Sequence, residues 1–282
     1  METSSFRSIA HGGCHLAYSV RGDGPPVVFI QGSGIHGEGW LPQVDKLAKR
    51  YQCLLFDNRG MGRSQPVGAG VTIEQMAEDV GVLMDAQGWK SAHVVGHSLG
   101  GLVAICFALS ARERVRSLSL LCTFSRGADA TQLSWKMFWL GLRSYIGTRR
   151  MRRRAFLNMV MPQGVLADAD CEALTERLAP LFGHDLADHP PVVMKQLAAM
   201  RQYDATPQLH HLSDLPTLVV TAKHDLIAKP QFGKALSLGI RGARYVDFPD
   251  AAHGVCIQCA DEINALLHEE FSKVEAGRAR PI

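Results

Sequence analysis

The chain has 282 residues, 46% of them hydrophobic and 20% charged, which suffices for one well-buried α/β domain with a large insertion. Its formal net charge of +3 is too small to argue for nucleic acid as a partner, and the sequence shows no nucleic-acid recognition motif. The opening METSSFRSIA lacks the apolar segment of a signal peptide, and the most apolar stretch, 102 to 109, is far shorter than a membrane span. We therefore expect a cytoplasmic protein without a transmembrane segment.

Strands and helices are expected to alternate along most of the chain. A helix should begin near Pro42, and another should run from Thr72, where Gln75 completes a capping box, to Gly88. The last residues, EAGRARPI, are expected to form a mobile tail. Strands are predicted over 5 to 9, 14 to 20, 27 to 31, 52 to 57, 92 to 96, 116 to 122, 217 to 222 and 244 to 248. Such alternation predicts an α/β fold with a mainly parallel sheet flanked by helices.

The string VVGHSLGG, 94 to 101, places Ser98 between a predicted buried strand and a predicted buried helix. The serine hydroxyl can project from such a junction only if the chain turns sharply. Gly96 and Gly100, two residues to either side, are small enough for strand and helix to pass close together. The pattern is typical of a nucleophile elbow.

An unaided serine is a poor nucleophile, so a general base and a group that orients the base are required. Asp225 directly follows the strand PTLVVTA, and His253 follows the strand RYVDF, so both lie beyond the carboxyl ends of strands. Asp250 and His224 are the alternatives. We prefer Asp225, because Asp250 is too near His253 in sequence to orient it from across the loop.

With these residues in the order serine, acid, histidine, the chain from about 5 to 275 resembles an α/β-hydrolase of the lid-bearing esterase and lactonase type. LLFDNRGMGRS, 54 to 64, resembles the DxRGxGxS segment of that family. This resemblance implies that Asp57, Arg59 and Ser64 brace loops near the site. No cofactor and no metal are implied.

The GSG that follows the strand VVFIQ resembles the family's oxyanion loop. By position, the resemblance implies that the backbone amides of Ser33 and Leu99 stabilise the developing oxyanion. Gln31 stands where the family usually has histidine, which puts the internal hydrogen bonding of the loop in question.

The same loop, GSGIHG at 32 to 37, also reads as GxGxxG, with Asp57 placed like a ribose-binding acid. A dinucleotide site needs a helix that starts at the loop. Gly39, Trp40 and Pro42 delay the helix, so we reject a dinucleotide-binding site.

Some ninety residues between the sixth and seventh predicted strands, 116 to 122 and 217 to 222, lack strand character. We expect residues 124–213 to form a helical cap inserted into a core of 1–123 and 214–282. Its helical stripe is a candidate substrate-binding wall, although it could equally pack the cap on the core. Other apolar residues, Leu133, Met137 and Leu140, occupy the remaining sides, so this helix should be buried almost all round and enclose an apolar pocket. The stripe consists of Trp135, Phe138, Trp139, Leu142 and Ile146.

An arginine-rich run, seven cysteines and a pair of adjacent histidines are the remaining notable features. RRMRRR, 149 to 154, is best interpreted as a solvated helix face, with a weak peripheral membrane contact or attraction of anionic substrates left open. The seven cysteines are expected to be reduced, and the CxxC of Cys256 and Cys259 to be coincidental. His210 and His211 are adjacent and should point apart, which argues against a metal site.

The sequence predicts a serine hydrolase that cleaves carboxylic esters of small to medium apolar acyl groups. Ser98 would attack, His253 would transfer the proton and Asp225 would fix the imidazole tautomer. Lactonase and perhydrolase activities need the same triad and stay open. Gly254, where carbon–carbon bond hydrolases usually have tryptophan, disfavours that chemistry. The alternative from another class is a ligand receptor with slow or no turnover. The sequence carries no signal for the oligomeric state.

Overall fold

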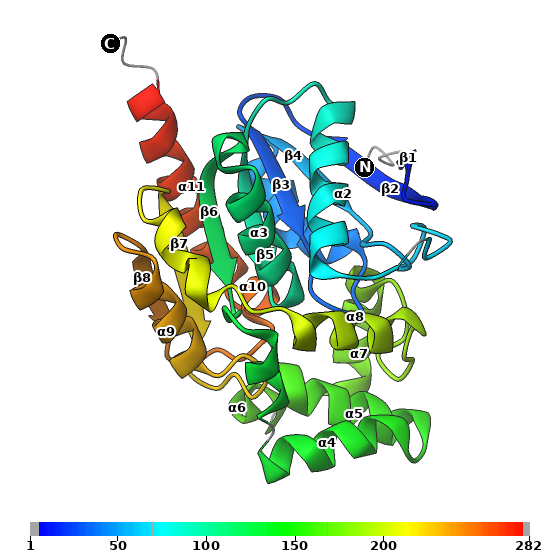
Figure 1. Ribbon diagram of the computed structural model, residues 1–282. Coiled ribbons are helices and arrows are strands. Elements are labelled where there is room, and N and C mark those ends of the chain that lie inside the picture. The colour runs from blue at the N-terminus through cyan, green and yellow to red at the C-terminus, as the bar shows by residue number, and fades with distance from the viewer. Residues whose placement is uncertain (1–5, 69, 133, 168, 279–282) are drawn as a thin grey trace.

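A single sheet of eight strands organises the computed structural model, which describes residues 6–68, 70–132, 134–167 and 169–278 (Figure 1). The strand order is β1-β2-β4-β3-β5-β6-β7-β8. The β1–β2 and β2–β4 pairs are antiparallel and the remaining pairs are parallel, which confirms the predicted fold class. The bounds are β1 Arg7–His11, β2 Cys14–Arg21, β3 Pro26–Ile30, β4 Gln52–Phe56, β5 Ala92–His97, β6 Val115–Leu121, β7 Thr217–Ala222 and β8 Arg244–Phe248.

Helices cover both faces of the sheet. Helices α1 and α11 pack against each other on one face, and α2, α3 and α9 cover the other (Figure 1). Within the part of the chain that the structure describes, no helix is both long and apolar enough to cross a membrane. The bounds are α1 Leu41–Leu47, α2 Ile73–Ala86, α3 Leu99–Ser110, α9 Pro230–Gly239, α10 Val255–Gln258 and α11 Ala260–Arg278.

The capping box expected at the start of α2 forms only in part. Thr72 Oγ1 accepts a hydrogen bond from the Gln75 amide at 3.0 Å, as in an N-cap. Among the described residues the Thr72 amide makes no return hydrogen bond to the Gln75 side chain, whose Nε2 donates to Glu78 at 3.0 Å. The helix ends before Gly88, whose φ of +66° is the left-handed conformation that favours glycine.

Residues 124–213, which we call the cap, lie at the carboxyl end of the sheet between β6 and β7 (Figure 1). Buried apolar side chains, among them Leu157, Leu178 and Phe182, form a cluster of their own there, separate from that of the core. The cap is nevertheless anchored, because Leu209 and Leu212 belong to the core cluster. The cap contains η3 Gly127–Thr131, α4 Trp135–Tyr145, α5 Arg149–Val160, α6 Gln163–Ala167, α7 Cys171–Phe182, α8 Val192–Gln202 and η4 Thr206–Leu212.

The prediction that the aromatic cap helix is buried almost all round is wrong. Met137 and Ser144 are its buried residues, whereas Trp135 is 72% exposed and Ile146, just beyond the helix, is 60% exposed. Helix α4 packs mainly on α5 along one side, and the described residues leave much of its other side uncovered. Leu133, which the same prediction included, lies outside the described residues.

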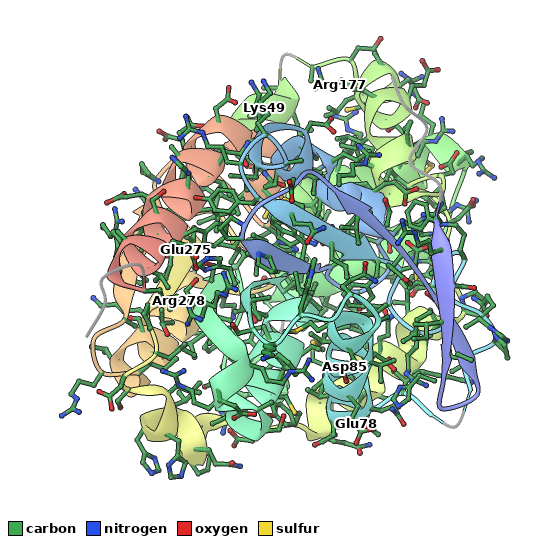
Figure 2. The ribbon with its side chains drawn as sticks, turned by 90° about the horizontal axis from the view of Figure 1, so that it is seen from above. Lys49, Glu78, Asp85, Arg177, Glu275 and Arg278 are labelled. Carbon is green, nitrogen blue, oxygen red and sulfur yellow. The ribbon has the colours of Figure 1, made fainter. Side chains whose placement is uncertain are left out.

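The predicted mobile tail is also wrong as far as residue 278, because α11 continues to Arg278. Figure 2 shows Glu275 and Arg278 near the end of this helix. Glu275 Oε1 lies 3.0 Å from Arg116 Nη1 and 3.2 Å from His93 Nε2, which fixes the last turns to β5 and β6. Residues 279–282 lie outside the described residues.

Candidate active site

Ser98 occupies a sharp turn between β5 and α3. Its φ of +53° and ψ of −121° are unusual for a residue with a side chain, and such strain persists only where surrounding contacts impose it. The flanking glycines explain how the turn fits. A Cβ on Gly96 would lie 2.3 Å from the Gly100 oxygen, and a Cβ on Gly100 would lie 2.2 Å from the Ile30 oxygen. Thr123 Oγ1 donates to the Ser98 carbonyl at 2.7 Å and so braces the turn.

The structure brings His253 and Asp225 together. His253 Nδ1 lies 2.8 Å from Asp225 Oδ2, and Asp225 Oδ1 accepts from the amides of Ile227 and Ala228 at 2.8 and 2.9 Å. If Nδ1 donates to the carboxylate, Nε2 is left as the basic nitrogen of the imidazole. Ser98 and His253 both line one cavity, and all three side chains are buried. The alternatives, Asp250 and His224, are exposed.

His97, which the sequence analysis did not single out, contacts the backbone of His253. Its Nε2 lies 2.9 Å from the His253 carbonyl oxygen, and the two rings lie 4.8 Å apart between centroids. Burial, followed by the nearby charge of His253, lowers the pKa of His97 to about 3. His97 is therefore neutral at physiological pH and donates from Nε2 to hold the His253 backbone in place.

The predicted oxyanion loop lies beside Ser98, where Gly32 and Ser33 line the cavity. Leu99 is the first residue of α3, so its amide has no acceptor within the helix. Gln31, which stands where the family usually has histidine, takes part in the internal hydrogen bonding of the loop. Its Oε1 accepts from the Gly32 amide at 2.8 Å, and Asn58 Nδ2 donates to its carbonyl at 2.8 Å.

The cap holds the other half of this loop. Gln196 on α8 is fully buried, and its Oε1 accepts from Ser33 Oγ at 2.9 Å and from the Gly34 amide at 3.2 Å. His184 Nε2, from the loop after α7, lies 2.7 Å from the Gly34 carbonyl. Nothing in the sequence marks Gln196 or His184, because each acts through a contact more than 140 residues away along the chain.

The cavity over Ser98 has a volume of about 530 Å³ and lies between core and cap. Most of its lining is apolar, and among the described residues that line it Arg201 is the one with a permanent charge. Of the three predicted substrate-binding residues, Phe138 lines the cavity, whereas Trp135 and Trp139 are not among the lining residues. The predicted stripe is therefore divided between the cavity and the outer surface.

The DxRGxGxS segment braces loops. Asp57 accepts from the amides of Gly37 and Arg63 at 2.8 and 3.0 Å, and Ser64 Oγ donates to the Asp57 carbonyl at 2.6 Å. Arg59 is fully buried and forms two hydrogen bonds with Asp79, at 2.6 and 2.7 Å. Because both Asp57 oxygens serve the loop, the residue is not placed to bind a ribose.

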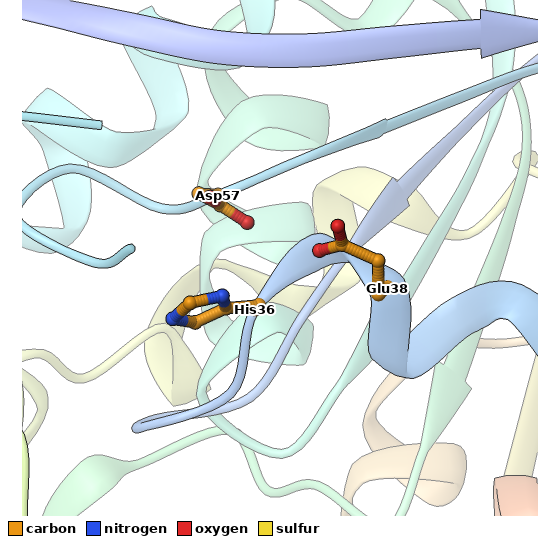
Figure 3. Close-up of side chains that lie close together, drawn as sticks. All are labelled: His36, Glu38 and Asp57. Atoms are coloured by element: carbon orange, nitrogen blue, oxygen red, sulfur yellow. The ribbon is translucent and has the colours of Figure 1, made fainter. Parts of the chain in front are cut away.

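Three groups of metal-ligand type, His36, Glu38 and Asp57, place one ligand atom each within 4.8 Å of one another (Figure 3). Arg63 already fills this space with a cation, because its guanidinium pairs with Glu38 and lies 3.1 Å from Asp57 Oδ2. Burial is the main cause that lowers the pKa of His36. We assign no metal to this cluster.

The two adjacent histidines of η4 lie closer together than expected. The rings of His210 and His211 have centroids 4.0 Å apart, so the prediction that they point apart is wrong. Both residues are exposed on η4, so no packing prevents the two rings from leaning together over the surface. Within the described residues, they form no cluster with a third metal-ligating side chain.

Known proteins resemble this chain over most of its length. The family model described as alpha/beta hydrolase fold matches residues 25–259. RutD of Azorhizobium caulinodans, named as a candidate carbamate hydrolase, is 30% identical over 266 residues, which cover 92% of this chain and 96% of that protein.

Solved hydrolase structures also superpose on nearly the whole chain. A hydrolase from Pseudomonas aeruginosa superposes with a TM-score of 0.80 at 26% identity, covering 96% of this chain and 98% of the other. The enol-lactonase from Burkholderia xenovorans superposes with a TM-score of 0.78 at 26% identity, covering 94% of this chain and all of the other. The chain therefore belongs to the alpha/beta hydrolase fold family.

Proposed function

We propose that this hydrolase cleaves carboxylic esters of small to medium apolar acyl groups through Ser98, His253 and Asp225. The observation that carries the proposal is the 2.8 Å contact between His253 and Asp225, with a strained Ser98 that lines the same cavity as His253. A neutral imidazole held in one tautomer, next to a serine hydroxyl, is the arrangement that acyl transfer requires.

In the proposed reaction, Ser98 Oγ attacks the ester carbonyl while His253 Nε2 takes its proton. The Ser33 and Leu99 amides stabilise the oxyanion, a contribution of about 3 kcal/mol for each well-placed donor. The protonated His253 then gives its proton to the leaving alcohol. Water, deprotonated by the same imidazole, hydrolyses the acyl-enzyme and restores Ser98.

The cavity supports the choice of substrate. Its volume of about 530 Å³ lies within the usual range for small-molecule sites, and its mainly apolar wall favours an acyl chain over a charged group near the serine. Seven free cysteines, with no disulfide, fit a reducing compartment and support our proposal that the protein works in the cytoplasm.

Turnover of p-nitrophenyl esters from acetate to octanoate tests the proposal, with Ser98→Ala as the control. Mass spectrometry after treatment with a fluorophosphonate should show one adduct, on Ser98. Ester turnover that survives Ser98→Ala would remove the assigned nucleophile. Acylation of Ser98 without release of the acyl group would favour a receptor that retains the fold and triad.

Cyclic esters and carbamates are the second candidate class, because similar proteins are named enol-lactonase and candidate carbamate hydrolase. Each of these substrates presents a carbonyl that Ser98 would attack in the same way. Comparing kcat/KM for a linear ester, a lactone and a carbamate of equal carbon number would rank the three.

A further inference from the structure

The outer side of α4 exposes an unusual set of large apolar side chains. We call this set the aromatic face, and its members are between 38% and 72% exposed. The ring centroids of Trp135 lie 5.6 Å from Phe138 and 5.8 Å from Trp139, so the exposed rings form one contiguous patch. A contiguous apolar patch of this kind marks a surface that contacts another apolar phase. Its members are Trp135, Phe138, Trp139, Leu142 and Tyr145.

The aromatic face continues into the cavity. Phe138, Leu142 and Tyr145 are exposed and also line the cavity over Ser98. A ligand that moves along these side chains from the surface to the serine stays on apolar groups. The patch is therefore the outer rim of the cavity entrance.

The same part of the cap is strongly basic. Residues 134–167 contain no acidic residue and carry seven basic ones, Lys136, Arg143, Arg149, Arg150, Arg152, Arg153 and Arg154. On a helix that turns 100° per residue, Lys136 and Arg143 lie seven positions apart on one flank, next to Trp139. Aromatic and aliphatic side chains bordered by lysine and arginine are typical of helices that lie in an anionic lipid interface.

Part of the basic charge is neutralised by the cap itself. Arg149 pairs with Asp185 and Asp188, and Arg153 pairs with Asp185 and Glu172. In the described part of the chain, ion pairs of this kind are found for neither Lys136 and Arg143 of α4 nor Arg152 and Arg154 of α5. Of these four, Lys136, Arg143 and Arg154 are exposed, so their charges remain available to an external anionic surface.

We propose that the aromatic face docks on an anionic lipid bilayer, which places the cavity entrance against the membrane. Charge complementarity selects this occupant, because a second copy of the chain would bring two basic caps together and repel itself. The docking does not depend on the chemistry at Ser98. Only its consequence, that sparingly soluble esters enter from the lipid phase, rests on the proposed function.

Binding to vesicles tests the proposal directly. The chain has four tryptophans, and because Trp40 and Trp89 are buried, a change in emission on binding reports on Trp135 and Trp139. With Ser98→Ala protein, vesicles of phosphatidylcholine and phosphatidylglycerol should shift the emission to shorter wavelength and co-sediment the protein. Vesicles of phosphatidylcholine alone should bind several-fold less, and added salt should weaken binding to the anionic vesicles.

Two variants separate the apolar from the charged contribution. The double variant Trp135→Ala with Trp139→Ala should lower the partition coefficient by about tenfold or more, measured by sedimentation. The double variant Lys136→Gln with Arg143→Gln should lower it by about fivefold for each charge. Leu238→Ala is the matched control. Leu238 is 78% exposed on α9, which lies outside the cap, so its loss should leave the partition coefficient unchanged.

Thermal unfolding of each variant checks that the fold is kept, and the charge variant remains informative if the tryptophan variant unfolds. Protein that stays in the supernatant with anionic vesicles would overturn the proposal. So would a dimer in size-exclusion chromatography that disappears in the tryptophan variant, because the face would then belong to a second copy. Because these experiments use Ser98→Ala protein, their result is independent of ester turnover.

Discussion

The core and the cap satisfy their charges and apolar side chains in different ways. In the core, the Arg59–Asp79 pair is almost fully buried, and apolar strands lie under helices on both faces. In the cap, Arg153 and Asp185 form a pair that is only partly buried, and α4 leaves aromatic side chains uncovered. The core thus holds Ser98, His253 and Asp225 in fixed positions, while the cap presents a surface that can meet lipid or substrate.

The two regions meet at the oxyanion loop. The core fixes its beginning through Gln31, and the cap fixes its middle through Gln196 and His184. Any motion of the cap therefore changes the loop that carries the Ser33 amide. The cap therefore helps to position groups at the site as well as to enclose it.

The largest effect is expected from the core residues at the site. Ser98→Ala and His253→Ala should each lower kcat by about 10⁴- to 10⁶-fold, because residues that act as a unit lose the whole effect together. Asp225→Asn should be nearly as damaging, and Asp250→Asn, at an exposed position, should be mild. Steady-state kinetics on p-nitrophenyl butyrate measures all four, and the reverse ranking of the two aspartates would move the acid to Asp250.

The next largest effect concerns the free energy of unfolding when one ion pair in the core or in the cap is removed. Arg59→Met should lower the free energy of unfolding by about 3 to 5 kcal/mol, because Asp79 is then left buried without its main partner. Arg153→Met should cost about 1 kcal/mol or less, since solvent screens the cap pair, although Arg153 holds the pKa of Asp185 well below its usual value. Urea unfolding measures both, and equal losses would contradict the contrast between core and cap.

The core was largely predictable from the sequence because each of its signals is local. Buried parallel strands are continuous apolar runs, and the Ser98 elbow needs glycines at fixed offsets, so strand bounds fell within about two residues of the predictions. The cap was not predictable in this way. The aromatic stripe on α4 marks a helix, but the same pattern fits a buried face or an uncovered one.

Long-range contacts account for what sequence reasoning missed at the site. Gln196 and His184 have no local motif, and they reach the oxyanion loop only because the cap folds over it. Gln31 is the exception, because its side chain accepts a hydrogen bond from the next backbone amide and its role involves no distant contact.

A third prediction concerns acid stability. The pKa of His97 is about 3 in the folded protein and about 6.5 in an unfolded chain, so the unfolded state binds more protons between these values. The stability that neutral His97 contributes is complete above pH 6.5 and declines as the pH falls toward 3. At pH 5 the loss is about 2 kcal/mol. In His97→Gln the free energy of unfolding should fall less between pH 7.5 and 5, and an unchanged fall would contradict this.

A fourth prediction tests the link between cap and oxyanion loop. Gln196→Ala removes the acceptor for Ser33 Oγ and the Gly34 amide, and should lower kcat by about tenfold with little change in KM. Gln196→Glu keeps an acceptor oxygen but buries a negative charge beside the oxyanion loop, so it should not restore the activity. If KM rises while kcat is unchanged, Gln196 only shapes the cavity and does not position the loop.

The smallest effect is expected on acyl-chain preference, and it should distinguish the residues of the α4 stripe that line the cavity from those that do not. Phe138 lines the cavity and Trp139 does not, although the two are similarly exposed. Phe138→Ala should favour longer acyl chains, by about fourfold in kcat/KM for each methylene that fills the vacated space, at about 0.8 kcal/mol per methylene. Trp139→Ala should leave the profile from acetate to octanoate unchanged. Assays with soluble esters and no vesicles keep membrane docking out of the comparison. If both variants shift the profile alike, the cavity extends beyond Phe138 to the outer surface of the cap.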